Sequence, residues 1–137
     1  MRHRLKDQKL GRTTAHRKAL MSALVCALIE QRRIRTTLAT AKSASSLAER
    51  MVSLGREGTL AAGRRALAVL RHRRYVRMLF DQVVPGCQDR QGGYTRIVRL
   101  GRRRSDGSEM AILEWVSLPA VQRKKAKKTV DAKASKT

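Results

Sequence analysis

GGYTRIVRLGRRRSDGSEMAILEWV, residues 92–116, predicts two β-strands joined by a polar turn. Successive side chains of a strand point to opposite faces, so the first strand divides into two sets of residues. One face carries Tyr94, Arg96, Val98 and Leu100, and the opposite face carries Thr95, Ile97 and Arg99. The pair Asp106-Gly107 supplies turn chemistry, inside a cationic loop that is longer than a tight two-residue hairpin.

The second strand of this hairpin shows the same alternation. Met110, Ile112, Glu114 and Val116 share one face, and Ala111, Leu113 and Trp115 share the other. Two strands alone are at best marginally stable in water. The β-branched segment IRTTL, residues 34–38, is therefore the expected third strand of the sheet.

Four helices are predicted from apolar spacing and from residues that cap or end helices. They are expected from Thr13 or Thr14 to about Arg33, from Ala39 to Gly55 or Gly58, over residues 59–70, and over residues 75–84 before Pro85. The apolar stripe of the first helix consists of Leu20, Leu24, Ala27 and Leu28, broadened by Met21, Val25 and Ile29. We expect Leu24 and Leu28 to lie under the sheet. Cys26, Phe80 and Trp115 are also expected in the core.

A length of 137 residues fits a single domain. We expect a basic extended arm over residues 1–12, one folded domain over residues 13–118, and a Lys-rich tail over residues 119–137. The tail has few large apolar side chains and a high positive charge. It cannot offset the entropy of its own ordering, so it is expected to be disordered when free.

Positive charge dominates the composition. The chain has 32 Lys and Arg against 10 Asp and Glu, a net charge of +22. Self-repulsion of this size is relieved by a polyanion. The charge gathers in four clusters, which are the arm, residues 64–65 with 71–74, the hairpin arginines and the tail. Their repetition, with little compensating acid, favours a nucleic-acid partner over a merely solvated face.

The aromatic content and the motifs of the sequence indicate which kind of nucleic acid is bound. The aromatic residues are few, so the sequence has no stacking platform of the type that single-strand readers use. It also has no zinc-finger spacing and no heptad zipper beside a basic region. Recognition of folded RNA by shape, through phosphates and 2′-hydroxyls, is the more economical interpretation.

Other function classes find little support. No stretch approaches the roughly 18 apolar residues of a membrane span, and the N-terminus lacks the apolar region of a signal peptide. The two cysteines fit neither a disulfide framework nor a zinc site. His3, His16 and His72 are not at metal-ligand spacing, and no acid–base or nucleophile motif is present. We therefore expect no enzyme activity, no cofactor, no membrane partner and no small-molecule substrate.

Four segments together resemble one protein family. MRHR (1–4), LGRTTAHR (10–17), IRTTLATAK (34–42) and the hairpin sequence resemble the bacterial large-subunit ribosomal protein L17 family, in order from Met1 to about Val116. The resemblance implies a two-layer α+β fold in the order helix, strand, three helices, two strands, with a small three-stranded sheet packed on helices. It also implies a cytoplasmic protein that binds large-subunit ribosomal RNA near the peptide exit tunnel, beside neighbouring ribosomal proteins.

The resemblance and the charge clusters together give a set of expected RNA-binding residues. By position in the family, RNA contacts are implied for Arg2, His3, Arg4, Arg12, His16, Arg17, Thr36, Thr37, Lys42, Tyr94, Thr95, Arg96 and Arg99. The basic clusters add Lys6, Lys9, Lys18, Arg64, Arg65, Arg71, Arg73, Arg74, Arg102, Arg103 and Arg104. Two alternatives from other classes are a DNA-compacting nucleoid protein and a small RNA-modifying enzyme. A dimerisation stripe would mark the first and a pocket with an acid or base the second, and the sequence shows neither.

The chain departs from the family pattern at two places. Leu38-Ala39 stands where the family often has proline after its paired threonines, so the start of the second helix is open. Trp115 stands where many members have leucine, which suggests a different local contact. Neither departure touches a basic position.

Overall fold

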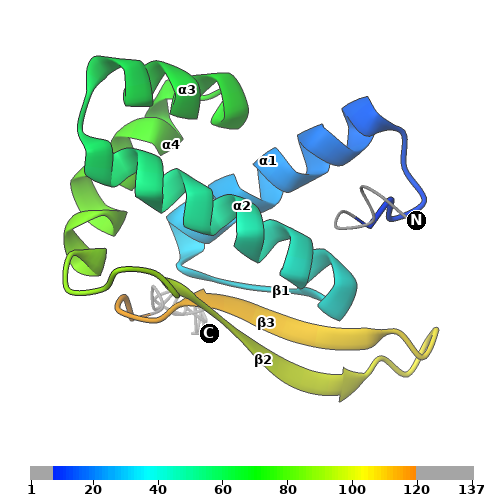
Figure 1. Ribbon diagram of the computed structural model, residues 1–137. Helices are drawn as coiled ribbons and strands as arrows, with labels where there is room; N and C mark the ends of the chain where they lie inside the picture. Colours follow the sequence, from blue (N-terminus) through cyan, green and yellow to red (C-terminus); the bar gives the residue numbers. More distant parts are fainter. Residues whose placement is uncertain (1–7, 120–137) are drawn as a thin grey trace, which may run out of the picture.

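The computed structural model describes residues 8–119 (Figure 1). Its helices are α1 (Thr14–Gln31), α2 (Leu38–Glu57), α3 (Leu60–Leu70) and α4 (Arg73–Met78). A π-helical turn (Leu79–Val83) and a 3₁₀ turn (Pro85–Cys87) follow α4. The strands are β1 (Arg33–Thr37), β2 (Thr95–Arg102) and β3 (Glu109–Trp115). This order confirms the expected α+β fold.

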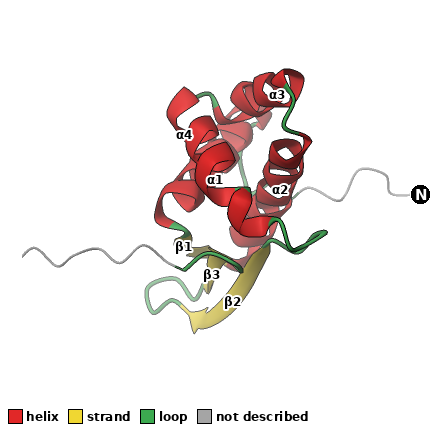
Figure 2. Ribbon diagram, turned by 90° about the vertical axis from the view of Figure 1, so that its left-hand side faces the viewer, coloured by secondary structure: helices red, strands yellow, loops and turns green. Residues whose placement is uncertain are grey.

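The helices and the sheet form two layers. Helices α1 and α2 lie over one face of the sheet, and α3 and α4 lie at one end of the helical layer (Figures 1 and 2). The strand order is β1-β3-β2, with both pairings antiparallel. The segment at 34–38 is the third strand as expected, shifted by one residue, and it pairs with β3. Leu38 is already the first residue of α2.

The helix ends explain why the chain turns where it does. The hydroxyls of Thr13 and Thr59 accept hydrogen bonds from backbone N–H groups in the first turns of α1 and α3. Helix α2 ends at Gly58, whose φ of 64° suits glycine. Helices α1 and α3 end instead at Arg32 and Arg71, both with a φ of 62°. A left-handed arginine at a helix end is unusual and carries backbone strain.

The buried face of α1 differs from the expected stripe. Leu28 is fully buried, but Leu20, Leu24 and Ala27 are only half-buried. The buried residues are Met21, Ser22, Val25, Cys26, Leu28 and Ile29. The face is rotated and wider because α1 packs against α2 and the sheet on one side and against α3 and α4 on the other. The prediction that Leu24 lies under the sheet together with Leu28 was therefore wrong, because α1 is rotated about its axis relative to the expected orientation.

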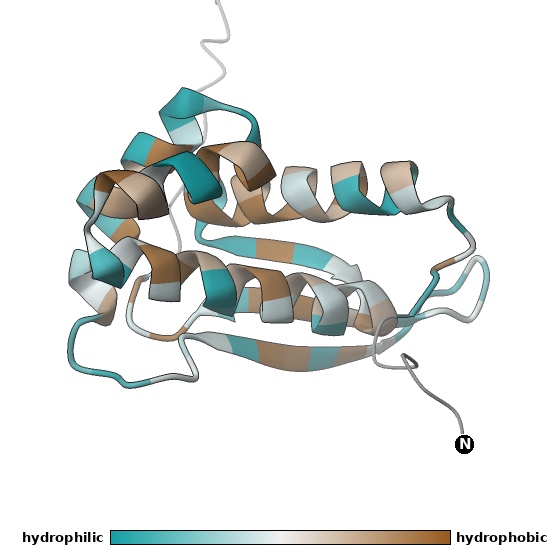
Figure 3. Cartoon of the chain, turned by 45° about the horizontal axis from the view of Figure 1, so that its top comes forward, coloured by the Kyte–Doolittle hydropathy of each residue, from teal (hydrophilic) through white to brown (hydrophobic). Residues whose placement is uncertain are grey.

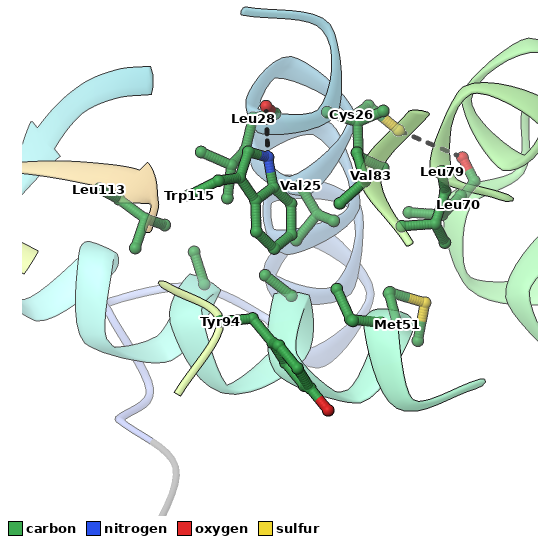
Figure 4. Packing of buried hydrophobic residues seen from close by; sticks show 14 of the residues in the cluster. Val25, Cys26, Leu28, Met51, Leu70, Leu79, Val83, Tyr94, Leu113 and Trp115 are labelled. Atoms are coloured by element: carbon green, nitrogen blue, oxygen red, sulfur yellow. Dashed lines mark hydrogen bonds between the residues drawn. The ribbon is translucent and has the colours of Figure 1, made fainter. Parts of the chain in front are cut away.

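The core lies between the two layers (Figures 3 and 4). Trp115 of β3 is buried against α1, and its indole Nε1 donates a hydrogen bond of 3.0 Å to the carbonyl oxygen of Leu28. Cys26 is a buried core residue, as expected, and burial raises the pKa of its thiol. Phe80 packs against this core while half-exposed.

The fourth helix is not continuous up to Pro85. It begins earlier than expected, at Arg73, and changes to a π-helical turn after Met78. This turn lies close to α2, where Gly55 is buried against Val84. A Cβ atom on Gly55 would lie 2.3 Å from Cγ2 of Val84, so the two segments approach closely only because residue 55 has no side chain.

The start of β2 corrects the predicted alternation. Tyr94 was placed on the face of Arg96, but the strand begins only at Thr95, and Tyr94 is buried while Arg96 is exposed. The strand then runs to Arg102, past the expected end at Leu100, with a bulge between Arg99 and Gly101. Gly101 has a φ of 92°, which permits this irregularity.

Candidate nucleic-acid interface

Most carboxylates of the described residues are paired with arginines of the same fold. The pairs are Glu114 with Arg33 and Arg96, Glu57 with Arg65, Glu30 with Arg74, Asp81 with Arg77, and Asp106 with Arg103. The arginines of residues 8–119 therefore fall into two groups. Some form an ion pair with a carboxylate of the fold, and the others have no carboxylate of residues 8–119 within ion-pair distance.

Glu114 is the most enclosed of these acids. It lies on the central strand β3, opposite Arg33 of β1 and Arg96 of β2 in the sheet register. Arg96 donates from Nε to Oε1 at 2.9 Å, and Arg33 donates from Nε to Oε2 at 2.6 Å. The hydrogen bonds from Arg96, followed by those from Arg33, hold the pKa of Glu114 below its usual range despite its burial. The predicted RNA-binding residue Arg96 thus also has a role in the sheet.

The hairpin turn is organised by Asp106. Its carboxylate accepts hydrogen bonds from Arg103 Nε at 2.8 Å and from Ser108 Oγ at 2.7 Å. The Arg103 and Ser108 bonds hold the pKa of this exposed carboxyl well below its usual range. Arg103 is therefore engaged in the turn, while its neighbours Arg102 and Arg104 are exposed and lack such a pair within residues 8–119.

One group of expected RNA-binding residues lies at the hairpin end of the molecule. The start of α1, the start of α2 and the tip of the β2–β3 hairpin all lie toward this end, at the right of Figure 1. We name the exposed residues of this end the hairpin-end group: Lys9, Arg12, His16, Lys18, Lys42, Arg99, Arg102 and Arg104. Thr36 and Thr37 are half-buried at the same end, where Thr37 Oγ1 lies 2.8 Å from Thr40 Oγ1.

A second group lies at the opposite end, on α3 and the connection to α4. We name it the joint group: Arg64, Arg65, Arg71, Arg73 and Arg74, all exposed. Arg65 and Arg74 pair with Glu57 and Glu30. The structure therefore distributes the expected cations over two ends. Between them lies a groove formed by α1, α2 and α3, which Arg17 and Arg71 help to line.

Two expected RNA-binding residues are engaged inside the protein. Tyr94 is buried, and its hydroxyl accepts a hydrogen bond of 2.8 Å from Arg56 Nη1. Thr95 donates through its backbone N–H and its hydroxyl to Glu49 Oε1, at 2.7 and 2.8 Å. These contacts attach Tyr94 and Thr95, the first residue of β2, to α2. An RNA role for these two residues stays a prediction from the resemblance.

The sequence reasoning missed several exposed cations. Arg35 on β1, Arg50 on α2 and Arg90 before β2 are exposed and lack a carboxylate partner within residues 8–119. They were missed because none belongs to the four basic clusters: Arg50 and Arg90 are isolated along the chain, and Arg35 follows Arg32 and Arg33 within a segment interpreted only as a strand. Helical spacing was the available signal for Arg50, since Lys42, Ser46 and Arg50 follow one another by four residues on α2.

Some expectations lie beyond what the structure describes or find no feature in it. Arg2, His3, Arg4 and Lys6, and the tail from residue 120, lie outside the described residues. The division into arm, domain and tail therefore stays a prediction. None of the helices in residues 8–119 has the length and apolar character needed to cross a bilayer. In the same range, no three His, Cys, Asp or Glu side chains gather as metal ligands would.

Comparison with known proteins decides the family. A family model described as ribosomal protein L17 matches residues 20–116. The chain belongs to the ribosomal protein L17 family. The expected resemblance is thereby confirmed, and the matched residues run from the first half of α1 to just after β3.

Curated relatives of the L17 family match over most of the chain. The large ribosomal subunit protein bL17 of Finegoldia magna is 46% identical over 125 residues, which cover 91% of this chain and 95% of the relative. The bL17 protein of Symbiobacterium thermophilum is 50% identical and covers 81% of this chain and 98% of the relative. That of Akkermansia muciniphila is 40% identical and covers 98% and 100%.

Proposed function

We propose that this L17 family member is a structural constituent of the bacterial large ribosomal subunit and binds its ribosomal RNA. The observation that carries the proposal is that some arginines form ion pairs within the fold while others do not. Most acids of residues 8–119 pair with arginines of the fold, and none of them pairs with a residue of the hairpin-end group, which leaves that group and part of the joint group available to a polyanion. The relatives are named large ribosomal subunit proteins, and the family is structural and not enzymatic.

The two groups define how the protein acts on RNA. Arginine makes planar, bidentate contacts with phosphates, and each neutralised phosphate releases counterions. Because the groups lie at opposite ends of the helical layer, each contacts a separate stretch of RNA backbone. A folded domain between two such stretches holds them at a fixed distance. Its contribution to translation is thus to stabilise the RNA fold of the large subunit in the cytoplasm.

Density-gradient fractionation of cells that express a tagged chain tests this proposal. We expect the chain in the large-subunit and whole-ribosome fractions, and it should leave these particles when salt is raised, because phosphate contacts are salt-dependent. The purified chain should also bind large-subunit RNA more tightly than a DNA duplex of similar length. Comigration with the nucleoid and equal affinity for DNA would support the DNA-compacting alternative and overturn the proposal.

The finer placement rests on the resemblance. It puts the chain near the peptide exit tunnel, in contact with neighbouring ribosomal proteins. Cross-linking of purified large subunits, followed by identification of the linked peptides, tests this part. We expect links to proteins around the tunnel exit, and links only to proteins on another face would contradict the placement.

A further inference from the structure

We propose that the groove between α1, α2 and α3 holds one unpaired nucleotide of the bound RNA. The base lies against aliphatic side chains of the groove, and its flanking phosphates contact the cations that surround it. This inference rests on the proposed function and adds to it a defined binding site. None of the basic clusters seen in the sequence corresponds to this site, because its residues come from three helices.

The groove has the size of a small-ligand site. Its volume is about 520 Å³, within the roughly 300–1,000 Å³ typical of ligand pockets. It lies on the side of α2 away from the sheet. Ser45 and Glu49 of α2 contact Thr95 at the start of β2, whereas Leu47 and Arg50 line the groove. The site is therefore open on the outer surface of the helical layer.

Apolar side chains form its inner part. Met21 of α1 is buried, and Leu47 of α2 and Val69 of α3 are half-buried. Aliphatic side chains of this kind contact the face of a base that has left its stack. The bases of a regular duplex are stacked inside and present only their edges. An apolar floor of this size thus favours an unpaired nucleotide over a paired one.

Positive charge surrounds the floor. Arg17, Lys18, Arg50 and Arg71 line the groove. Within residues 8–119, no acidic residue lines it and none of these cations has an ion-pair partner. Lys18, Arg50 and Arg71 are exposed, so they are at the rim, where the phosphates on either side of a bound base pass. This charge complementarity commits the groove to a polyanion.

Arg71 connects the groove to the joint group. It ends α3 with a φ of 62°, as Arg32 ends α1. Arg17 and Lys18 make the same connection to the start of α1, so an RNA strand bound at both ends crosses the groove.

Two serines complete the polar lining. Ser43 and Ser46 of α2 both line the groove. The hydroxyl of Ser43 donates to the carbonyl oxygen of Ala39 at 3.3 Å and can still accept a hydrogen bond. Hydroxyls at this place suit the exocyclic amines of a base or a 2′-hydroxyl. Both partners belong to a nucleotide.

Ala68 offers a substitution that disturbs the groove while leaving the core intact. It is exposed on α3 and lines the groove, and Ala61 is exposed on the same helix but does not line it. Ala68→Glu places a carboxylate beside the cations of the groove. Ala61→Glu makes the same change of charge elsewhere and is the matched control. Each new glutamate has an arginine three residues later, Arg71 or Arg64. Residue 68 lies in the last turn of α3, where the helix dipole disfavours a carboxylate, and residue 61 lies in the first turn, so thermal unfolding of both variants checks that the fold is retained.

The experiment probes large-subunit RNA in complex with the full chain, using two readouts. Hydroxyl-radical cleavage reports protection of the RNA backbone, and reagents that modify unpaired bases report protection of individual bases. With the parent chain we expect backbone protection and one unpaired base that loses its reactivity. Ala68→Glu should restore the reactivity of that base to the level of free RNA and keep the backbone protection at the hairpin-end group. Ala61→Glu should keep both.

The outcomes separate the inference from the proposed function. If the parent chain protects the backbone but no unpaired base, or if both variants protect the same base, the groove inference is wrong and RNA binding stands. If the parent chain leaves no backbone footprint, the proposed function fails and the groove inference with it. If cross-linking of whole large subunits joins the groove to an acidic protein segment, and Ala68→Glu removes that cross-link while the base footprint is unchanged, the groove binds protein and the inference is wrong.

Discussion

Arg96 on β2 donates two hydrogen bonds to Oε1 of Glu114, the only acid on the outer face of the central strand. Arg33 on β1 donates to the other carboxylate oxygen. The three residues form a row across all strands of the sheet. A residue that the sequence suggested for RNA binding alone therefore also joins two strands, and its substitution affects both stability and binding.

The side chains of Arg33, Glu114 and Arg96 differ in exposure, and this difference gives the first prediction. The side chain of Glu114 is 8% exposed, while those of Arg33 and Arg96 are 50% and 60% exposed. The double variant Arg33→Ala, Arg96→Ala leaves a buried carboxylate without partners, at a cost of about 3–5 kcal/mol. Glu114→Gln leaves two arginines that water can solvate, and should cost about 1–2 kcal/mol. Urea unfolding of both variants measures the difference. Equal losses would show that Glu114 is solvated when unpaired.

The lowered pKa of Glu114 predicts how stability depends on pH. A carboxyl group with a lower pKa in the folded state contributes stability above its unfolded pKa of about 4.3, and this contribution is lost as pH falls through the folded value. The stability difference between the parent and Glu114→Gln should be constant above about pH 5.5 and shrink below about pH 4. Asp106 has a lowered pKa in both proteins, so its effect cancels in this comparison. A difference that stays constant down to about pH 2 would contradict the assigned pKa direction.

Two helix glycines predict opposite effects of the same substitution. Gly63 lies inside α3 with no atom within 4 Å of an added Cβ, so Gly63→Ala should stabilise by about 0.5–1 kcal/mol through helix propensity. Gly55→Ala would bring a methyl group against the stiff, β-branched side chain of Val84. It should destabilise the protein by about 1–3 kcal/mol despite the same gain in propensity. Thermal unfolding distinguishes the signs, and stabilisation by both changes would mean that the π-helical turn can move away from α2.

Two substitutions of Trp115 should lower the stability by different amounts. Trp115→Phe keeps most of the buried ring and loses the hydrogen bond to the carbonyl oxygen of Leu28, which still accepts from the N–H of Arg32 at 2.8 Å. Because this carbonyl keeps a partner, the loss should be about 1–2 kcal/mol. Trp115→Ala should cost about 3–5 kcal/mol through the cavity it leaves. Chemical denaturation measures both, and equal effects would show that the indole N–H, not the ring volume, stabilises the packing of the sheet on α1.

Substitutions at the hairpin tip should weaken RNA binding without lowering the stability of the fold. Arg102 and Arg104 are exposed and unpaired within residues 8–119, so replacing both with alanine should change stability by less than about 0.5 kcal/mol per site. The slope of log affinity for RNA against log salt should fall by about 0.7–0.9 for each phosphate that the variant no longer neutralises. The control Arg77→Ala removes an exposed arginine of α4 that is not in either group and should leave the slope unchanged. An unchanged slope in the double variant would remove the tip from the RNA interface.

The sequence predicts those features of the fold that depend on neighbouring residues, and it misses those that depend on residues far apart in the chain. The alternation in β3 correctly placed Ala111, Leu113 and Trp115 on one face, because this pattern is local. It gave no sign that Glu114, on the other face, is buried, since that burial depends on arginines far away in the sequence. The rotation of α1 was missed for the same reason: α3 and α4 cover a second side of that helix.

The candidate interface shows the same limit. Charge clusters correctly identified exposed arginines and lysines, because a basic run without apolar neighbours is almost always at the surface. Which of them are neutralised by the fold depended on acids elsewhere in the chain, as Arg65, Arg74 and Arg103 show. Arg50 became a candidate only when three helices brought it beside Arg17 and Arg71.

The strand order β1-β3-β2 leaves two edges where no further strand of residues 8–119 pairs. Open edges tend to add strands from other copies and so to start aggregation. Both edge strands carry cations without an ion-pair partner in residues 8–119, Arg35 on one and Arg99 and Arg102 on the other. Two copies that approach edge to edge bring like charges together, which opposes pairing. These edge arginines thus oppose the pairing of free copies of the protein, and this protection weakens wherever salt or a polyanion neutralises them.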